Sequence, residues 1–215
     1  MTTVPANPKI YHITHIDNLS KIVADGKLWS DAKRLEKSLD CKLVGMSAIK
    51  QRRLSIHDVK CHADTKVGQY VPFYFCPRSI MLYILSCGNH PDITYRDGQD
   101  KILHLEADLQ RVVDWAGSLK RRWVFSDRNA SSYIAGFYND VKELSRINWS
   151  AVESTDFRNS DVKEGKQAEF LVFLSFPWKL IEKVGVIDET AQAKVKRLLD
   201  SKHQPEVEVE KTWYF

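Results

Sequence analysis

The stretch that decides the fold is Lys166-Gln167-Ala168-Glu169-Phe170-Leu171-Val172-Phe173-Leu174-Ser175-Phe176. It is almost wholly apolar and rich in aromatic and branched side chains, which predicts a buried strand. Glu169 stands near the start of this strand, and Gln167 shares its face because alternate residues of a strand point the same way. Burying a lone carboxylate is costly, so we expect Glu169 either to reach water or to meet a compensating partner.

The 215 residues are enough for one domain with a sizeable core, so we treat 1–215 as a single domain. With 43% hydrophobic and 28% charged residues, the composition is typical of a globular protein and excludes a disordered or fibrous one. No apolar run reaches membrane-spanning length, and the first eight residues lack the layout of a signal peptide. We therefore expect a cytoplasmic protein with no membrane partner.

The four cysteines form no CxxC pair and show no disulfide-like spacing, which favours reduced thiols. His57, Cys61 and His62 come nearest to a metal-ligand cluster, but their spacing matches no standard zinc pattern. We expect no metal.

The net charge of +4 is spread unevenly. Basic residues gather in two regions, which suits a polyanionic partner, although a solvated basic face is the commoner explanation of such regions. The two groups are Lys42, Lys50, Arg52, Arg53, Lys60 and Lys66, and then Lys120, Arg121, Arg122 and Arg128.

Strands and helices do not alternate regularly, so the pattern favours an α+β fold. Pro72 predicts that its strand lies at an edge or begins there. Asp17, Asp108, Gly26 and Gly88 have the properties of helix caps and stops. Strands are predicted at 9–14, 70–76, 102–105, 123–125, 166–176, 184–187 and 207–209, with 213–215 completing an edge strand. Helices are predicted at 17–25, 31–39, 49–54, 80–86, 108–116 and 189–199, with a helical region over 126–147.

Residues 40–68 form a long polar excursion, and an excursion of this length inside a compact domain is more often functional than decorative. Residues 148–165 are polar and irregular and run directly into the strand that carries Glu169. The sequence contains no GxGxxG, Walker A, GxSxG or HExxH motif. Common nucleotide-binding, hydrolase and metalloprotease signatures are therefore absent.

Three blocks of this sequence resemble the DarT family of DNA ADP-ribosyltransferase toxins. They are Tyr11-His12-Ile13-Thr14-His15-Ile16-Asp17-Asn18-Leu19, Val71-Pro72-Phe73-Tyr74-Phe75-Cys76-Pro77-Arg78-Ser79 and Lys166-Gln167-Ala168-Glu169-Phe170-Leu171-Val172. Shorter matches at Ile102-Leu103-His104-Leu105, Phe125-Ser126-Asp127 and Trp213-Tyr214 extend the resemblance over most of the chain. The residues in these blocks favour the branch of the family that modifies thymine rather than guanine.

The resemblance implies the split mixed β-sheet of an ADP-ribosyltransferase with surrounding helices, and NAD as a consumed substrate. It also implies a toxin, acting as a monomer, that transfers ADP-ribose to thymine bases in single-stranded DNA and releases nicotinamide. The partner that it implies is an antitoxin with a macrodomain, which removes the modification.

Carried over residue by residue, the resemblance makes Glu169 and Arg53 the catalytic residues. Residues 36–55 would close over NAD, and 148–168 would read the DNA target. The NAD-binding residues would be His12, Ile13, Thr14, Asn18, Trp29, Arg53 and Tyr74. The DNA-binding residues would be Lys50, Arg52, Met81, Asn129 and Trp149, although Met81 and Trp149 belong to types that more often lie in a core.

These roles agree with the chemistry. Cleavage of the nicotinamide–ribose bond builds positive charge on the anomeric carbon, which a preorganised carboxylate stabilises. The guanidinium of Arg53 suits paired oxygens and stays charged, so it is a poor general base. Some members of the family have a histidine at the position of Asn129. A role of that histidine in the transfer does not carry over to this chain.

Two other functions are compatible with the sequence. One is ADP-ribosylation of RNA or protein by the same chemistry. The other is a non-catalytic nucleic-acid-binding module on the same scaffold. Consumption of NAD separates the enzymes from the module, which would bind DNA with a strong salt dependence and leave NAD intact.

Overall fold

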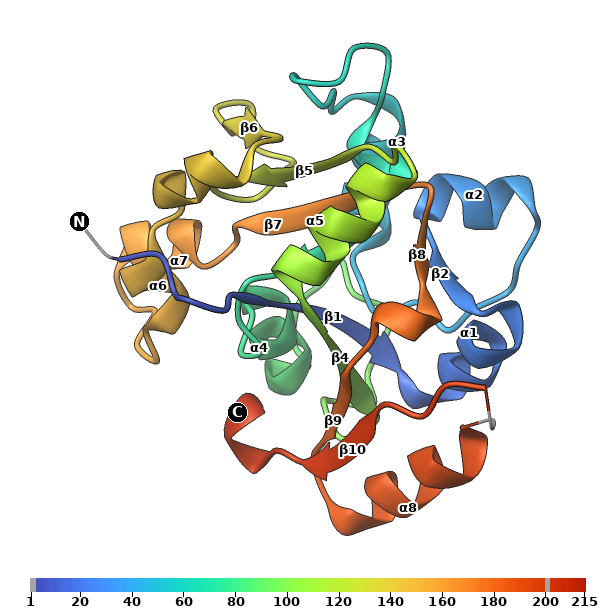
Figure 1. Ribbon diagram of the computed structural model, residues 1–215. Helices are drawn as coiled ribbons and strands as arrows, with labels where there is room; N and C mark the ends of the chain where they lie inside the picture. Colours follow the sequence, from blue (N-terminus) through green and yellow to red (C-terminus); the bar gives the residue numbers. More distant parts are fainter. Residues whose placement is uncertain (1–2, 200–201) are drawn as a thin grey trace.

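A computed structural model describes residues 3–199 and 202–215. An eight-stranded sheet in the order β10-β9-β4-β1-β3-β7-β5-β6 forms the centre (Figure 1). Neighbouring strands are antiparallel except β10 and β9, so the sheet is mixed. The strands are β1 (Lys9–His15), β3 (Tyr70–Tyr74), β4 (Ile102–Asp108), β5 (Trp123–Ser126), β6 (Phe137–Tyr138), β7 (Glu169–Phe173), β9 (Lys183–Val186) and β10 (Glu206–Val209). A second sheet pairs β2 (Lys27–Trp29) with β8 (Ser175–Pro177).

The large sheet is split in its middle. Strand β1 pairs with β4 over seven residues, but it meets β3 at one residue pair only, Tyr11 with Tyr74. Pro72 lies beside this gap, and its carbonyl oxygen is 2.7 Å from Nδ1 of His12 on β1. The N–H and C=O of one strand residue point to the same side. The missing N–H of Pro72 therefore faces β1, where β3 forms no ladder of backbone hydrogen bonds at this position. The prediction that Pro72 marks an edge or the start of a strand is therefore wrong, since Pro72 is the middle residue of a central strand.

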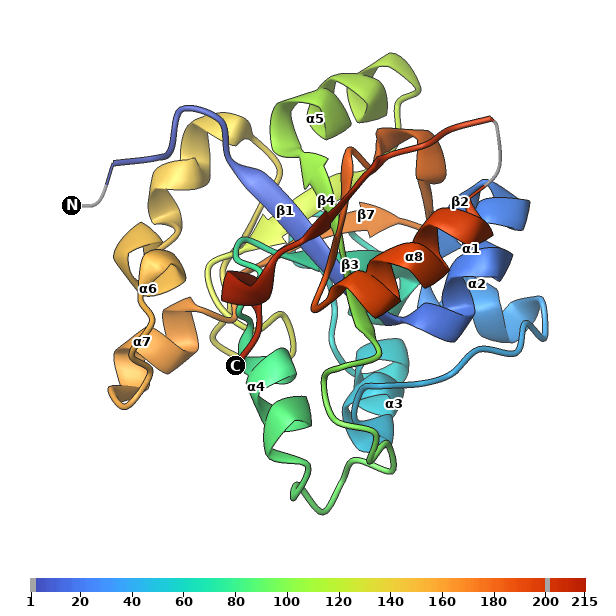
Figure 2. The same cartoon turned by 90° about the horizontal axis from the view of Figure 1, so that it is seen from below.

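Helices cover both faces of the sheet. Figure 2 shows α5 on one face and α3 and α4 on the other. The α-helices in the described part of the chain are α1 (Leu19–Asp25), α2 (Asp31–Glu36), α3 (Ser47–Ser55), α4 (Ile80–Cys87), α5 (Leu109–Ser118), α6 (Trp149–Glu153), α7 (Ser160–Gly165) and α8 (Glu189–Leu198). The short 3₁₀ helices are η1 (Ile16–Asn18), η2 (Val67–Gln69), η3 (Val141–Arg146), η4 (Trp178–Leu180) and η5 (Lys211–Trp213).

Helix ends follow the sequence signals in most cases. The side chain of Asp108 accepts a hydrogen bond from the backbone of Arg111 and caps α5. Gly26 and Gly88 end α1 and α4 with φ of 64° each, a conformation that glycine adopts without strain. Asp17 is an exception, because it lies within η1 and pairs with Lys194 instead of capping α1.

Four predicted segments differ from the structure. The strand expected over 166–176 begins at Glu169 and stops at Leu174, whose φ of 64° turns the chain into β8. The helical region expected over 126–147 is a loop, β6 and η3, and the irregular 148–165 segment contains α6 and α7. The last residues form η5 rather than a strand, while β10 is the edge strand that was predicted at 207–209.

The core lies on both faces of the central strands. Phe73 and Phe170 are fully buried and belong to its main cluster, together with Trp149 of α6 at 2% exposure. No helix in the described part of the chain is long and apolar enough to cross a bilayer. No three histidine, cysteine or acidic side chains in that part are grouped as a metal site requires.

Candidate active site

Glu169 is buried and fully paired. It opens β7 with a side chain only 2% exposed, next to Arg53 of α3. Arg53 donates from Nη1 to Oε1 at 3.1 Å and from Nη2 to Oε2 at 2.7 Å, and the backbone N–H of Ala130 donates to Oε1 at 3.0 Å. This bidentate arrangement is the strong form of an arginine–carboxylate pair and offsets the cost of burial. Of the two expectations for Glu169, the compensating partner is the one that the structure confirms.

The charges in this pair are stable. Burial by itself lowers the pKa of Arg53, but the charge and hydrogen bonds of Glu169 outweigh burial and hold that pKa above its usual value. Tyr74 lies directly opposite Glu169 in the β3–β7 register. Burial and the negative charge of Glu169 raise the pKa of Tyr74, so its phenol is neutral at ordinary pH. Neither Arg53 nor Tyr74 is therefore able to act as a general base.

The loop between β5 and β6 supports the carboxylate from the other side. Ser126 accepts a hydrogen bond from the backbone N–H of Glu169 at 3.3 Å. Asn129 donates from Nδ2 to Oε1 of Gln167 at 3.0 Å and accepts from the backbone of Ser131 at 2.8 Å. The amide of Asn129 thus ties this loop to the residues that precede β7.

A pocket of about 400 Å³ lies along the split in the sheet, within the size range of small-molecule sites. Pro72 and Tyr74 share one face of β3, and Pro72 lines this pocket. Because Glu169 of β7 lies opposite Tyr74, the carboxylate is next to the pocket, one strand over. Five of the residues predicted to bind NAD line the pocket, namely His12, Ile13, Thr14, Asn18 and Trp29.

His12 offers this pocket a hydrogen-bond acceptor. Because the carbonyl oxygen of Pro72 can only accept, the proton of the 2.7 Å contact belongs to Nδ1 of His12. Burial lowers the pKa of His12 although the Pro72 carbonyl opposes this effect, so the ring is neutral near pH 7. Nε2 then carries the free lone pair at the wall of the pocket.

Residues 38–44 of the predicted excursion form the opposite wall. Asn18 fixes this wall, because its Nδ2 donates to the carbonyl of Lys42 at 2.9 Å and its Oδ1 accepts from the N–H of Lys42 at 2.8 Å. Lys21 adds a hydrogen bond to the carbonyl of Asp40 at 2.9 Å. Asn18 is therefore a positioning residue as well as a lining one.

The residues predicted to contact DNA lie in different environments. Lys50 lines the pocket and pairs with Asp31 at 2.9 Å, whereas Arg52 is exposed on α3. Met81 is half-buried against a second apolar cluster. For Trp149 the prediction is wrong, because its indole is in the core and donates to the carbonyl of Leu144 at 2.9 Å.

In the basic region at 42–66, most of the positive charges are neutralised by neighbouring carboxylates. Four of its cations form ion pairs, which weakens the argument from charge to a polyanion on this side. These pairs are Lys42 with Asp97, Lys50 with Asp31, Arg53 with Glu169 and Lys66 with Asp58.

Two features of the site had little or no signal in the sequence. Ala130 contributes only a backbone N–H, which no side-chain pattern reveals. Tyr133 and Ile134 are 78% and 70% exposed on the same loop, and Tyr133 contacts the ring of His57 with centroids 5.4 Å apart. Two adjacent large apolar residues in a polar stretch are the signal that the sequence offers for this loop.

Comparison with known proteins agrees with this geometry. The family model described as DarT, ssDNA thymidine ADP-ribosyltransferase, matches residues 11–215. A DNA ADP-ribosyl transferase of Thermus aquaticus is 37% identical, over 98% of this chain and 90% of the relative. A DNA ADP-ribosyl transferase-DNA ADP-ribosyl glycohydrolase fusion protein of Thermosipho africanus is 28% identical, over 94% of this chain and 48% of the relative.

Solved structures of a Thermus sp. 2.9 DarT have the same fold. The complex with ADP-ribosylated ssDNA superposes with a TM-score of 0.89 at 32% identity, covering 100% of this chain and 99% of the other. The complex with NAD+ gives a TM-score of 0.83, also at 32% identity, and covers 99% of this chain and 100% of the other. The predicted α+β fold with a split mixed sheet is thereby confirmed.

Proposed function

Because this chain belongs to the DarT family of ssDNA thymidine ADP-ribosyltransferases, it is an NAD-dependent DNA ADP-ribosyltransferase, and we propose which of its residues carry out each part of the reaction. The reaction replaces the nicotinamide–ribose bond of NAD with a bond from the same ribose carbon to thymine in single-stranded DNA. The observation that carries the proposal is the buried Glu169–Arg53 pair beside a pocket of small-molecule size.

Glu169 stabilises the positive charge that develops on the ribose carbon as nicotinamide leaves. The hydrogen bonds of its carboxylate are unequal, because Oε1 accepts from Arg53 and Ala130 whereas Oε2 accepts from Arg53 alone. A carboxylate oxygen accepts two hydrogen bonds, so Oε2 keeps a lone pair for a ribose hydroxyl. Loss of such a preorganised group typically lowers kcat by about 10² to 10³.

Arg53 has two tasks. It holds the plane of the Glu169 carboxylate, and its permanent charge stabilises the negative charge that develops on thymine as N3 loses its proton. Arg53 and Tyr74 cannot take that proton, so it leaves to water or to Glu169. Arg53→Lys separates the two tasks because it keeps the charge and loses the bidentate fork. We expect a kcat lower by tenfold or more with NAD binding retained, whereas a near-normal kcat would reduce the role of Arg53 to charge alone.

The pocket holds NAD through the described polar groups along the split. Nε2 of His12 accepts a hydroxyl hydrogen, Thr14 offers its hydroxyl, and Trp29 offers an aromatic face. Trp29 is held in place by a 2.7 Å hydrogen bond from its indole to Asp25, and Lys27 and Lys37 lie 5.0 and 4.9 Å from its ring. Residues 36–55 then form the cover of the site.

The DNA approaches Glu169 from the side of the β5–β6 loop and residues 148–168. Tyr133 is exposed on that loop, and an exposed aromatic ring is the usual platform on which unpaired bases stack. Arg52, next to Arg53 on α3, and Asn129, on the same loop as Tyr133, supply groups for phosphate or base contacts. The hydrogen bond between Asn129 and Gln167 holds residues 148–168 against the β5–β6 loop.

The decisive experiment is intact-mass analysis of single-stranded oligonucleotides incubated with the protein and NAD. We expect one ADP-ribose to be added when thymine is present, and none with Glu169→Gln. Glu189→Gln, which removes an exposed carboxylate on α8, is the matched control and should keep full activity. Adducts on guanine alone would contradict the thymine assignment. Turnover of NAD without a DNA adduct would indicate RNA or protein acceptors. No turnover of NAD would indicate a non-catalytic nucleic-acid-binding module.

The proposal also covers a partner protein, the oligomeric state and the location of the protein. We propose that the chain acts as a cytoplasmic monomer and that a macrodomain antitoxin removes its product, as the fusion relative combines a transferase with a glycohydrolase by name. Light scattering tests the monomer. Incubating the modified oligonucleotide with a macrodomain glycohydrolase tests the removal, and a persistent adduct would contradict it.

A further inference from the structure

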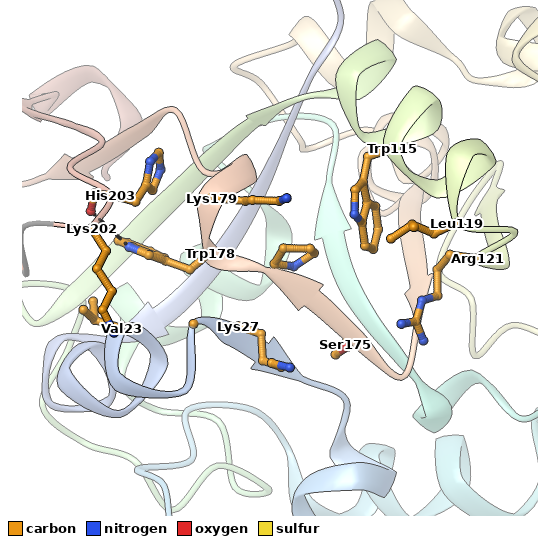
Figure 3. Close-up of a pocket in the computed structure, with 12 residues that line it drawn as sticks. Val23, Lys27, Trp115, Leu119, Arg121, Ser175, Trp178, Lys179, Lys202 and His203 are labelled. Carbon is orange, nitrogen blue, oxygen red and sulfur yellow. Dashed lines mark hydrogen bonds between the residues drawn. The ribbon is translucent and has the colours of Figure 1, made fainter.

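A second pocket, of about 390 Å³, lies outside the NAD pocket. Figure 3 shows it between α5, the β8–η4 segment and the turn that joins α1 to β2. Lys27 of β2 lines both pockets, so β2 forms a wall of each. No residue of the Glu169–Arg53 pair or its supports lines this second pocket.

The lining of the second pocket is basic. It includes Lys27, Arg121, Lys179, Lys202 and His203, and no aspartate or glutamate among the residues that the structure describes. Lys27, Arg121 and Lys179 form no ion pair within the described chain, unlike most cations of the 42–66 region. Several cations without ion-pair partners around one hollow attract an anion better than a single surface lysine does.

The walls of the same pocket are aromatic and fixed. Trp178 is 3% exposed and donates from Nε1 to the carbonyl of His203 at 3.4 Å. Trp115 is half-buried, with its ring 6.5 Å from that of Phe176. Figure 3 shows the two indoles on different sides of the hollow, with Lys179 extending between them. A flat ring fits against such walls while its charged group meets the cations.

We propose that this pocket binds a nucleoside phosphate, with the base against Trp115 and the phosphate on Arg121 and Lys179. The source is either a free nucleotide or a nucleotide of the substrate strand outside the target base, and the second source rests on the proposed function. Ser175, which lines the pocket, is six residues beyond Glu169, and the chain turns between them at Leu174. A strand that reaches the pocket therefore extends past the base being modified.

The test uses the full chain carrying Glu169→Gln, with excess NAD so that the first pocket is filled. Calorimetric titrations with thymidine 5′-monophosphate and with thymidine measure the free-nucleotide arm. Titrations with oligonucleotides of 4 and 20 nucleotides over a range of salt concentrations measure the strand arm. Each is repeated with Lys179→Glu, Arg121→Glu and the matched control Lys196→Glu, an exposed charge reversal on α8.

We expect Lys179→Glu and Arg121→Glu to weaken the binding of one class of probe by tenfold or more, with Lys196→Glu unchanged. If thymidine 5′-monophosphate is affected and thymidine does not bind, the ligand is a free nucleotide. If only the 20-nucleotide strand is affected, and its salt slope falls by about 0.7 for each lost phosphate contact, the ligand is the strand. Equal affinities in all variants, for both probes, overturn the proposal. Adduct formation on the 4-nucleotide strand by protein with Glu169 intact is scored separately and tests the proposed function alone.

Discussion

Arg53→Met should leave the Glu169 carboxylate buried with one backbone donor. The pair is held by two charge-assisted hydrogen bonds of 3.1 and 2.7 Å, and its side chains are 13% and 2% exposed. Removing one partner of a buried ion pair costs about 3–5 kcal/mol, because the other charge is left without compensation. We expect the free energy of unfolding to fall by that amount. Glu169→Gln added to Arg53→Met removes the stranded charge and should recover about half of the loss.

Urea unfolding followed by tryptophan fluorescence measures this cycle. With a slope of about 3 kcal/mol per molar urea, the midpoint should fall by about 1–2 M. Arg52→Met is the matched control, because Arg52 is the neighbouring exposed arginine and forms no ion pair in the described chain. Its effect should stay within about 0.5 kcal/mol. A loss below 1 kcal/mol for Arg53→Met, or strictly additive effects in the double variant, would refute the reasoning.

Three further changes have defined outcomes. Burial lowers the pKa of His104 to about 4. As the pH falls, the unfolded chain therefore takes up this proton before the folded chain does, and the free energy of unfolding should fall by about 3 kcal/mol between pH 6.5 and 4. An equally steep loss in His104→Gln would contradict this. Tyr133→Ala should raise KM for single-stranded DNA about tenfold and leave KM for NAD unchanged, as steady-state kinetics would show. Nζ of Lys166 donates to the buried carbonyl of Val152 at 2.7 Å, and Lys166→Met removes this donor. The free energy of unfolding, measured in urea, should fall by about 1–3 kcal/mol because the carbonyl loses its partner. An unchanged value would mean that water replaces the lysine.

The sequence pointed to side chains that the structure brings together. His12 and Glu169 lie in family blocks long enough to fix their positions in the fold, and Arg53, outside those blocks, pairs with Glu169. The caps at Asp108 and Gly88 followed from local hydrogen-bonding and backbone rules. Both kinds of information lie within a few neighbouring residues.

The parts that failed depend on distant contacts. Leu174 adopts a positive φ because its N–H and C=O bond to Gln69 and Ser30, which lie far away in the sequence. Ala130 supports the carboxylate through its backbone alone. Trp149 has the chemistry of a base-stacking residue, and only packing decides that it belongs to the core.

The single residue pair between β1 and β3 makes the protein two half-sheets joined by a narrow seam. His12 belongs to one half and Glu169 to the other, so NAD bound in the proposed site would hold the halves together. Its binding would then stabilise the fold, with a logarithmic dependence on the concentration of NAD. On this proposal, the two halves are held together until the ADP-ribosylated strand leaves the pocket.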